Sequence, residues 1–407
     1  MNVFDPRTYS TDWEIMVVDR LDRWVDNFEI LLGFAGELRS ELDLPVQIDW
    51  NSLEFAMGIN TSFTQFWERV KLVTDRASQL LHEYDLDLFP AGSHPIAPMF
   101  NSSHIHVGTI HDESAGIRME SRLMRYSPAF AALAANSPAA EGRRGEFKSY
   151  RVRYTARGCT RPGTLRDPQF AQPEWGTDAA PKVYGAPTLE VRICDCASSR
   201  RLLAEFATFI AAYVHYQGTR VDNHPKMTAE EYRECLTNRW AAAKYGLQAT
   251  FSWQGKPRTA VELIDEMLDE CQAELNVLGV KRSDLNIINT MLEKRTCQAD
   301  FALSIMDRYP DPYLLSSAYG KLARNWDIFE EYLENAPTLE PAPMLDEKAV
   351  MAEHLSFVGE GTHFYHLREA MFYPAPATDK IIEDMIEQEL IKREITPNCG
   401  TLLHRIG

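Results

Sequence analysis

Polar residues spaced two apart in strand-like segments are the first sign of chemistry in this chain. They form three pairs and one single acid: Asp12 with Glu14, His104 with His106, Glu190 with Arg192, and Glu54. Alternate side chains of a β-strand point to the same face, so each pair would share one side of a sheet. Burying several carboxylates together is costly unless cations neutralise them. The pattern favours a site for Mg²⁺ or Mn²⁺, since these ions take oxygen ligands and Mn²⁺ also tolerates an imidazole.

Two simpler explanations compete with a site for such cations. Alternating polar residues on a strand usually indicate one solvated sheet face, although such faces normally also contain Lys, Thr and Ser. The H-x-H pair in "SSHIHVG" would suit zinc, but a catalytic zinc needs a third protein ligand from elsewhere. From these residues alone, a metal, a phosphate and a packed core all remain open for the two histidines.

The composition is that of a globular protein, with 407 residues, 45% hydrophobic and 25% charged. The net charge of −17 would repel nucleic acid and anionic membranes, so neither is expected as a partner. No apolar run approaches the roughly 20 residues of a membrane span, and the N-terminus lacks the features of a signal peptide. Seven cysteines without framework spacing indicate reduced thiols, and we expect a cytoplasmic protein.

Residue patterns divide the chain into a mixed first half and a helical second half. Strands are expected at 13–19, 47–59, 103–110, 147–155 and 188–195, with helices at 61–86 and 116–135 between them. Further helices are expected at 199–217, 228–245, 259–278, 283–306, 312–333 and 377–394. We predict one catalytic domain over 1–407, with a sheet-rich core at about 10–198, a helical part at about 199–335 and a C-terminal segment at 346–407.

Two features concern nucleotides and substrates. Neither GxGxxG nor GxxxxGK[ST] occurs, so the common glycine-rich phosphate cradles are absent from the sequence. The connection at 157–187 is rich in Pro, Gly and Asp, and a connection of that length without periodicity is more often functional than idle.

Seven motifs in one order give the chain a resemblance to a known family. They are "DWEIMVVD", "SLEFAMG", "AGSHPIA", "SSHIHVG", "NSPAAEGRRGEFKSYR", "TLEVRICD" and "NRWAAAKYGL", which together span roughly residues 10–250. The chain resembles carboxylate–amine ligases of the glutamate–cysteine ligase type 2 family, which are related in fold to glutamine synthetase.

The resemblance implies an α+β fold in which a curved, mainly antiparallel sheet forms a funnel with helices packed on its outer face. It also implies a reaction in which ATP phosphorylates a substrate carboxylate and an amine attacks the acyl phosphate to give an amide. Such chemistry uses divalent metals, Mg²⁺ or Mn²⁺, to screen the phosphates. The implied partners are small amino-acid substrates, and a homodimer is expected because dimers are the commonest oligomers.

The resemblance also suggests residue roles. Five residues look like metal ligands: Asp12, Glu14, Glu54, His104 and Glu190. Three look like catalytic groups that contact phosphate or a substrate carboxylate: Arg192, Arg151 and His106. Arg143 joins these three as a candidate for binding the nucleotide, because a guanidinium can contact phosphate through two hydrogen bonds.

The chain departs from the family pattern in ways that leave other functions open. Asp12 stands where the family usually has Glu, Trp13 is bulkier than expected, and residues 359–372 replace a Gly-rich segment that bears Arg or Gln. One alternative is a phosphotransferase, since guanidino kinases share a related fold. The other alternative is a non-catalytic regulatory relative that has kept the sheet.

Overall fold

The computed structural model describes most of the chain. The described ranges are 4–49, 51–97, 99–110, 113–140, 142–154, 178–182, 187–220 and 229–350, followed by 362–363, 383, 386–388, 391–396 and 400–405. The expected functional connection at 157–187 and the divergent segment 359–372 therefore lie almost entirely outside the described residues.

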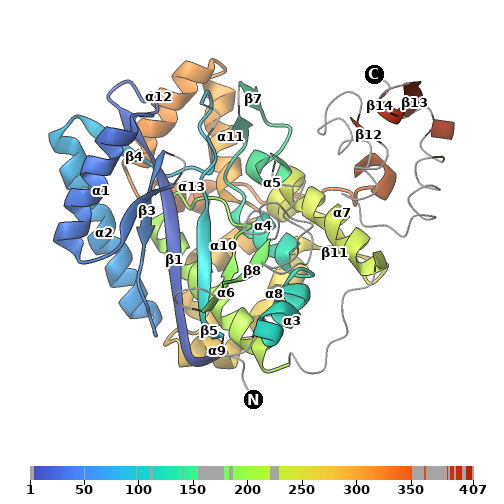
Figure 1. The fold of residues 1–407 in the computed structure, drawn as a ribbon, viewed down its shortest axis with the longest axis horizontal. Helices are drawn as coiled ribbons and strands as arrows, with labels where there is room; N and C mark the ends of the chain where they lie inside the picture. The colour runs from blue at the N-terminus through green and yellow to red at the C-terminus, as the bar shows by residue number, and fades with distance from the viewer. Residues whose placement is uncertain are drawn as a thin grey trace.

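A seven-stranded sheet forms the centre of the molecule, and every strand pair in it is antiparallel. Its order is β2 (Val46–Asp49), β3 (Ser52–Ala56), β1 (Phe4–Asp19), β5 (Ser103–Ile110), β9 (Thr188–Val191) and β8 (Ala179–Lys182). The short strand β4 (Leu86–Phe89) pairs with the last four residues of β1. Figure 1 shows β1 and β5 side by side along the middle of the sheet.

Helices cover one face of this sheet. The helix α6 (Arg200–Gly218) lies against β1 and β5, while α2 (Phe63–Glu83) packs on α6 and β4, and α1 (Phe28–Leu42) packs on β2. The α2 sequence buries an apolar stripe at helical spacing that includes Phe66, Val70 and Val73. Tyr9 of β1 hydrogen-bonds with Thr208 of α6 at 2.9 Å, and Trp13, four residues further on the same face of the strand, is 0% exposed. Asp12 and Glu14 therefore face the opposite side of the sheet, because side chains alternate along a strand.

The second half of the chain is helical. Its helices are α7 (Ala229–Tyr245), α8 (Ala260–Glu270), α9 (Gln272–Val277), α10 (Asn286–Lys294), α11 (Gln298–Arg308), α12 (Pro312–Ala323) and α13 (Ile328–Asn335). Two further helices, α3 (Glu113–Leu123) and α4 (Ser127–Ala134), lie in the first half of the chain. Two short ribbons pair β6 (Ala139–Ala140) with β7 (Arg143–Arg144) and β10 (Thr250–Trp253) with β11 (Lys256–Thr259). A separate sheet has the order β12 (Thr362–His363), β14 (Gly400–Arg405) and β13 (Ile391–Thr396). From residue 200 to 335 the described residues are mainly helical, with the β10–β11 ribbon between α7 and α8, while the predicted division of the chain stays a prediction.

The strand predicted at 147–155 is wrong, because its described residues include the helix α5 (Tyr150–Tyr154). Ser149 precedes this helix, and its hydroxyl accepts a hydrogen bond from the N–H of Val152 at 3.0 Å, which is the geometry of a helix N-cap. Tyr150, Arg151 and Val152 are all buried, so the alternation of apolar and basic residues does not mark one solvated face. The sequence pattern was that of a strand, but tertiary packing on both sides of the segment decided the structure.

Other element boundaries also differ from the predictions. Residues 47–59 form a hairpin rather than one extended segment, with Asn51 at a φ of 63° between β2 and β3. The predicted helix 116–135 is two helices that separate near Tyr126, and Pro128 lies in the first turn of the second. At the C-terminus, residues 391–394 of the predicted helix 377–394 belong to β13.

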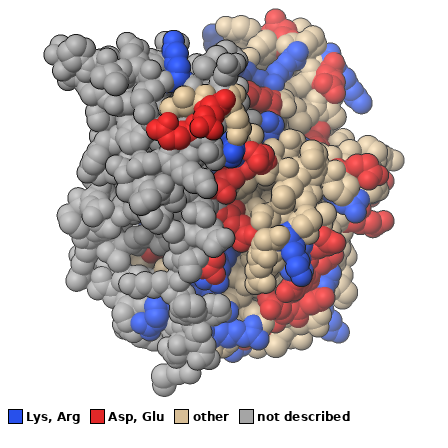
Figure 2. Space-filling model, turned by 90° about the vertical axis from the view of Figure 1, so that its right-hand side faces the viewer, with Lys and Arg blue, Asp and Glu red and all other residues tan. Residues whose placement is uncertain are grey.

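Acidic and basic side chains both reach the described surface (Figure 2). Figure 2 shows Asp and Glu side chains gathered in several groups on one face, with lysine and arginine side chains between them. Among the helices of the described ranges, none combines the length and the apolar character needed to cross a membrane.

Candidate active site

The strand register places the predicted pairs on one face of the central sheet, away from α6. Asp12 lies opposite His104, Glu14 opposite Glu54, and His106 opposite Glu190. Directly opposed residues of antiparallel strands project from the same face. We call this set the polar face; its members are Asp12, Glu14, Asp49, Glu54, His104, His106 and Glu190.

The first group of the polar face combines two carboxylates and an imidazole. Asp12, His106 and Glu190 each offer a ligand atom, and these atoms lie within 4.8 Å of one another. Nε2 of His106 lies 2.9 Å from Oδ2 of Asp12 and 3.6 Å from Oε1 of Glu190. Nδ1 of His106 hydrogen-bonds with the Thr188 hydroxyl at 3.0 Å, which fixes the orientation of the ring.

The second group consists of carboxylates alone. Glu14, Asp49 and Glu54 place oxygen atoms within 4.8 Å of one another. Glu14 accepts a hydrogen bond from the Ser102 N–H at 2.8 Å, and Glu54 accepts one from the side chain of Gln47. Asp49 was not among the predicted ligands. It lies at the end of β2, and recognising 47–59 as a hairpin would have placed it on the same face as Glu54.

His104 lies between the two groups. Its Nδ1 atom is 3.2 Å from Oε1 of Glu190 and 3.7 Å from Oε1 of Glu14, while its Nε2 atom hydrogen-bonds with the Ser102 hydroxyl at 2.7 Å. The sequence suggested His104 as the metal ligand and His106 as the phosphate contact. The structure places His106, rather than His104, within a three-residue group, so the division of roles between the two histidines stays a prediction.

Burial and neighbouring charges perturb the pKa values of both groups. Burial raises the pKa of Glu14 to about 8 and that of Glu54 to about 7. Burial also acts on Glu190, but the Arg192 guanidinium and the two histidines outweigh it and hold the pKa of this carboxyl well below its usual range. Burial lowers the pKa of His104 to about 4, so its imidazole is neutral at physiological pH. Perturbations of this kind in both directions are typical of functional sites.

Arg192 directly follows β9, and Arg151, on α5, contacts the backbone of the same segment. Nη1 of Arg192 donates to Oε1 of Glu190 at 2.7 Å, so the positive charge of Arg192 lies beside the polar face. Arg151 is buried, and its guanidinium donates to the backbone carbonyls of Ile193 at 3.1 Å and Arg192 at 2.8 Å. These bonds hold in place the segment that carries Arg192. The predicted phosphate contact of Arg151 stays a prediction.

The remaining motif residues have structural partners. The Asp195 carboxylate accepts hydrogen bonds from the Asn136 N–H and from the hydroxyls of Ser137 and Ser149, at 2.8 to 3.0 Å. His94 accepts at Nδ1 from the N–H groups of Ile96 and Ala97. Its ring therefore stabilises a turn.

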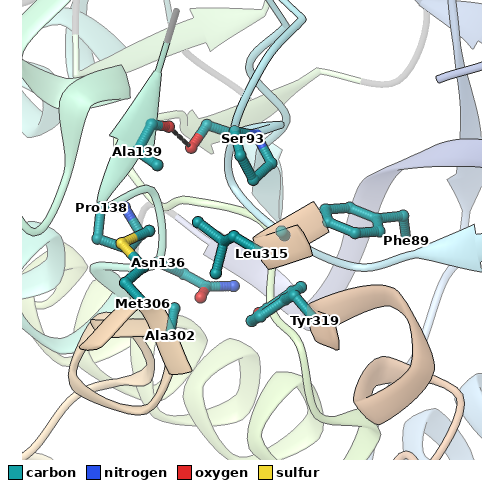
Figure 3. Close-up of a pocket in the computed structure, with 11 residues that line it drawn as sticks. Phe89, Ser93, Asn136, Pro138, Ala139, Ala302, Met306, Leu315 and Tyr319 are labelled. Carbon is teal, nitrogen blue, oxygen red and sulfur yellow. Dashed lines mark hydrogen bonds between the residues drawn. The ribbon is translucent and has the colours of Figure 1, made fainter. Parts of the chain in front are cut away.

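Arg143 lies apart from the polar face, exposed on the β6–β7 ribbon, which is a different sheet. A cavity beneath this ribbon has a volume of about 20 Å³, and Figure 3 shows Asn136, Met306, Leu315 and Tyr319 around it. That volume is enough for about one water but not for a nucleotide or an amino acid. We assign this cavity to packing rather than to the site.

The sequence model of glutamate–cysteine ligase family 2 matches residues 67–161 and 176–308, which is more than half of the chain. The chain belongs to this family. Within the matched ranges lie His104, His106, Arg151, Glu190 and Arg192, while β1, β2 and β3 precede them. The predicted family is confirmed.

Two relatives extend the similarity over more of the chain. A Rubrobacter xylanophilus protein, named provisionally as glutamate–cysteine ligase 2-3, is 26% identical over 340 residues, which cover 68% of this chain and 90% of the relative. A Nocardia farcinica protein, named provisionally as glutamate–cysteine ligase 2-2, is 24% identical over 291 residues, which cover 60% of this chain and 76% of the relative.

Two solved structures share the fold at low sequence identity. Glutamate–cysteine ligase of Francisella tularensis, solved with AMP, has a TM-score of 0.55 and 11% identity over 92% of this chain and 98% of that one. The bifunctional glutathione synthetase of Pasteurella multocida has a TM-score of 0.55 and 12% identity, and the match covers 86% of this chain and 55% of that longer one. The predicted α+β, glutamine synthetase-like fold class is confirmed.

Proposed function

We propose that the protein is an ATP-dependent carboxylate–amine ligase that forms a γ-glutamyl-type amide through an acyl phosphate. The observation that supports it most is the gathering of five carboxylates in two groups on one sheet face, in a member of glutamate–cysteine ligase family 2. A substrate carboxylate oxygen would attack the γ-phosphorus of ATP and release ADP. The amine nitrogen would then attack the acyl carbon, lose a proton and release phosphate.

The polar face fits divalent cations. Oε2 of Glu190 is buried and makes no hydrogen bond to the described residues; its described ion-pair partner is the half-exposed Lys182 ammonium, at 3.3 Å. An ionised, buried carboxylate oxygen of this kind is favourable only with a cation beside it. Asp12, His106 and Glu190 would hold one cation, and Glu14, Asp49 and Glu54 a second. Bound Mg²⁺ or Mn²⁺ would supply positive charge to the ATP phosphates and the transferring phosphoryl group.

The other groups of the site prepare this face for substrates. Arg192 keeps Glu190 ionised and adds a fixed positive charge at the edge of the first group. Arg151 would position Arg192 through the two backbone carbonyls, and the neutral imidazole of His104 would separate the two groups without adding charge. Arg143, on another ribbon, is a weaker candidate for contact with the nucleotide. A homodimer stays a prediction.

The decisive experiment is incubation of the protein with ATP, Mn²⁺ or Mg²⁺ and a panel of amino acids. Glutamate is the first acid to test and cysteine is among the first amines; a structural relative solved with AMP makes adenine nucleotides the first choice. We expect ADP and phosphate in a 1:1 ratio with a new amide, and loss of all three in Glu190→Gln. Glu41→Gln, which alters an exposed acid paired with Arg76, is the matched control.

Three other outcomes would contradict the proposal. ADP with a phosphorylated guanidine and no amide would identify a phosphotransferase. Failure to bind nucleotide in the presence of Mn²⁺ would identify a non-catalytic relative. Full turnover in Glu190→Gln would show that the assigned metal site is wrong.

A further inference from the structure

Lys182, on the edge strand β8, contacts the polar face from the far side of β9. Its Nζ atom lies 3.3 Å from Oε2 of Glu190, and its side chain is 37% exposed while that of Glu190 is 1% exposed. The sequence offered no motif for this lysine. β8 pairs with β9 so that Ala180 lies opposite Glu190 and Lys182 lies opposite Thr188. This register places the Lys182 side chain at the edge of the site.

We propose that Lys182 binds the nucleotide phosphates, and that in the cation-free protein it instead holds Glu190. This inference rests on the proposed function, because it requires cations and a nucleotide at the polar face. In the cation-free state the ammonium neutralises the Glu190 oxygen that a cation would take. When a cation occupies that oxygen, like-charge repulsion would weaken the contact of Lys182 with Glu190 and leave the ammonium to the phosphates.

The two oxygens of Glu190 differ in their partners, and this difference supports the exchange. Oε1 accepts from Arg192 Nη1 at 2.7 Å and lies 3.2 Å from Nδ1 of His104. Among the described residues, the ion-pair partner of Oε2 is Lys182, whose Nζ atom lies 3.3 Å away. Hydrogen bonds between an ammonium and a carboxylate are usually 2.7 to 2.9 Å long, so the 3.3 Å contact is a loose one.

The position of the ammonium also suits phosphate. Its positive charge acts on both Glu54 and His106, which belong to different groups of the polar face. The ammonium therefore acts on both groups and would attract the negative charge of phosphates held there. A lysine has a compact charge on a flexible stem, so it can change partners without movement of its strand. Arg192 keeps Glu190 ionised during this change.

The test compares Lys182→Met and Lys182→Arg with the wild type, using Mn²⁺ alone and then a non-hydrolysable ATP analogue, adenylyl imidodiphosphate. Free Mn²⁺ is followed by electron paramagnetic resonance, and binding of the analogue at saturating Mn²⁺ by calorimetry. Lys71→Met is the matched control. Lys71 has a side chain 34% exposed and pairs with Glu68 at 2.7 Å on α2, so it resembles Lys182 in exposure and pairing but lies outside the site.

We expect Lys182→Met to bind Mn²⁺ more tightly, by roughly threefold or more, because a competing charge is removed. We expect the same variant to bind the analogue about tenfold more weakly, because a charge-assisted contact is lost. Lys182→Arg restores analogue binding in part, and Lys71→Met changes neither quantity. A residue that only stabilised the fold would not shift the two affinities in opposite directions.

Unchanged analogue affinity in Lys182→Met would overturn the proposal. Weaker Mn²⁺ binding would also overturn it, because Lys182 would then orient Glu190 rather than compete with the cation. If the wild type binds no Mn²⁺, both this inference and the metal site of the proposed function are contradicted. A wild type that binds Mn²⁺ and the analogue but forms no amide would contradict the proposed reaction alone.

Discussion

Two buried acids outside the polar face, Asp178 and Glu205, are bonded through both carboxylate oxygens, unlike Glu190 on the polar face, whose Oε2 makes no hydrogen bond to the described residues. Asp178, 1% exposed, accepts from Nε of Arg239 at 3.0 Å with each of its two oxygens, and one of them also accepts from the Ser127 hydroxyl. Glu205 accepts from the N–H groups of Ile287 and Ile288 at 2.9 and 3.1 Å. Each of these carboxylates ties together elements that are distant in the sequence.

On the polar face, carboxylates lie near other carboxylates. Glu14, Asp49 and Glu54 share a small volume, and burial raises the pKa of Glu14 and of Glu54. An arrangement of this kind does not stabilise the fold by itself, because like charges in a poorly solvated region repel each other. Variants in both sets of acids test whether the grouped acids of the polar face bind cations, as proposed, while Asp178 and Glu205 stabilise the fold.

The largest expected effect concerns the bonded acids. Arg239→Met leaves Asp178 buried without its ion-pair partner, and we expect the free energy of unfolding to fall by about 3–5 kcal/mol. Urea denaturation at pH 7 measures the change. Glu54→Gln is the contrasting variant, since removing one of several like charges should leave stability unchanged or higher. Equal losses of unfolding free energy in the two variants would show that Asp178 and the acids of the polar face do not differ in their contribution to stability.

The next effect concerns function rather than stability. Glu190→Gln removes a charge from the first group, and we expect turnover to fall by more than about 100-fold, since even outer-shell changes at metal sites lower activity 10–100-fold. Mn²⁺ binding should weaken while cooperative unfolding is retained. Turnover within about threefold of wild type would show that Glu190 is a structural acid like Asp178.

The unequal pKa shifts of the polar face predict how the stability of the cation-free protein depends on pH. Between pH 6.5 and 8 the folded protein retains protons on Glu14, with a pKa of about 8, and in part on Glu54, with a pKa of about 7. The unfolded chain, with ordinary glutamate pKa values, does not. Unfolding then releases protons, so stability should fall as pH rises through this window, by about 1–2 kcal/mol.

Two measurements check the pH prediction. Below pH 6.5 the slope should lessen, because His104 has a pKa of about 4 when folded and takes up a proton on unfolding. Saturating Mn²⁺ should abolish the fall above pH 6.5, as should the double variant with Glu14→Gln and Glu54→Gln. A stability that rises from pH 6.5 to 8 without cations would contradict the assignment.

The sequence was sufficient to predict that Asp12, His106 and Glu190 share one face of the sheet, although it suggested His104 rather than His106 as the imidazole ligand. The i, i+2 spacing in 12–14, 104–106 and 190–192 determines a common side of each strand, and the order of motifs determines the fold family. The sequence could not assign His104 and His106 to different neighbours. The register of β5 places His104 opposite Asp12 and His106 opposite Glu190, but the side chains also contact diagonally: His106 lies 2.9 Å from Asp12, and His104 lies 3.2 Å from Glu190.

Two other features needed the tertiary structure. The sequence 147–155 alternates as a strand would, but it contains α5 because both apolar and basic side chains find buried partners there. Lys182 lies in a segment without any motif, and only the pairing of β8 with β9 brings it to Glu190. Local patterns report which residues share a face, whereas contacts across strands depend on pairing that no short motif records.

The smallest expected effect separates the two groups of the polar face. Asp49→Asn removes one of three carboxylates of the second group and none of the first, so we expect only one step of a two-step Mn²⁺ titration to weaken, by about tenfold. Asp43→Asn is the matched control, because Asp43 is exposed, lies six residues away and adopts a φ of 50°, which Asn tolerates. If Asp49→Asn weakens both steps equally, the two groups form one site, and Asp49 belongs with the acids that organise the sheet.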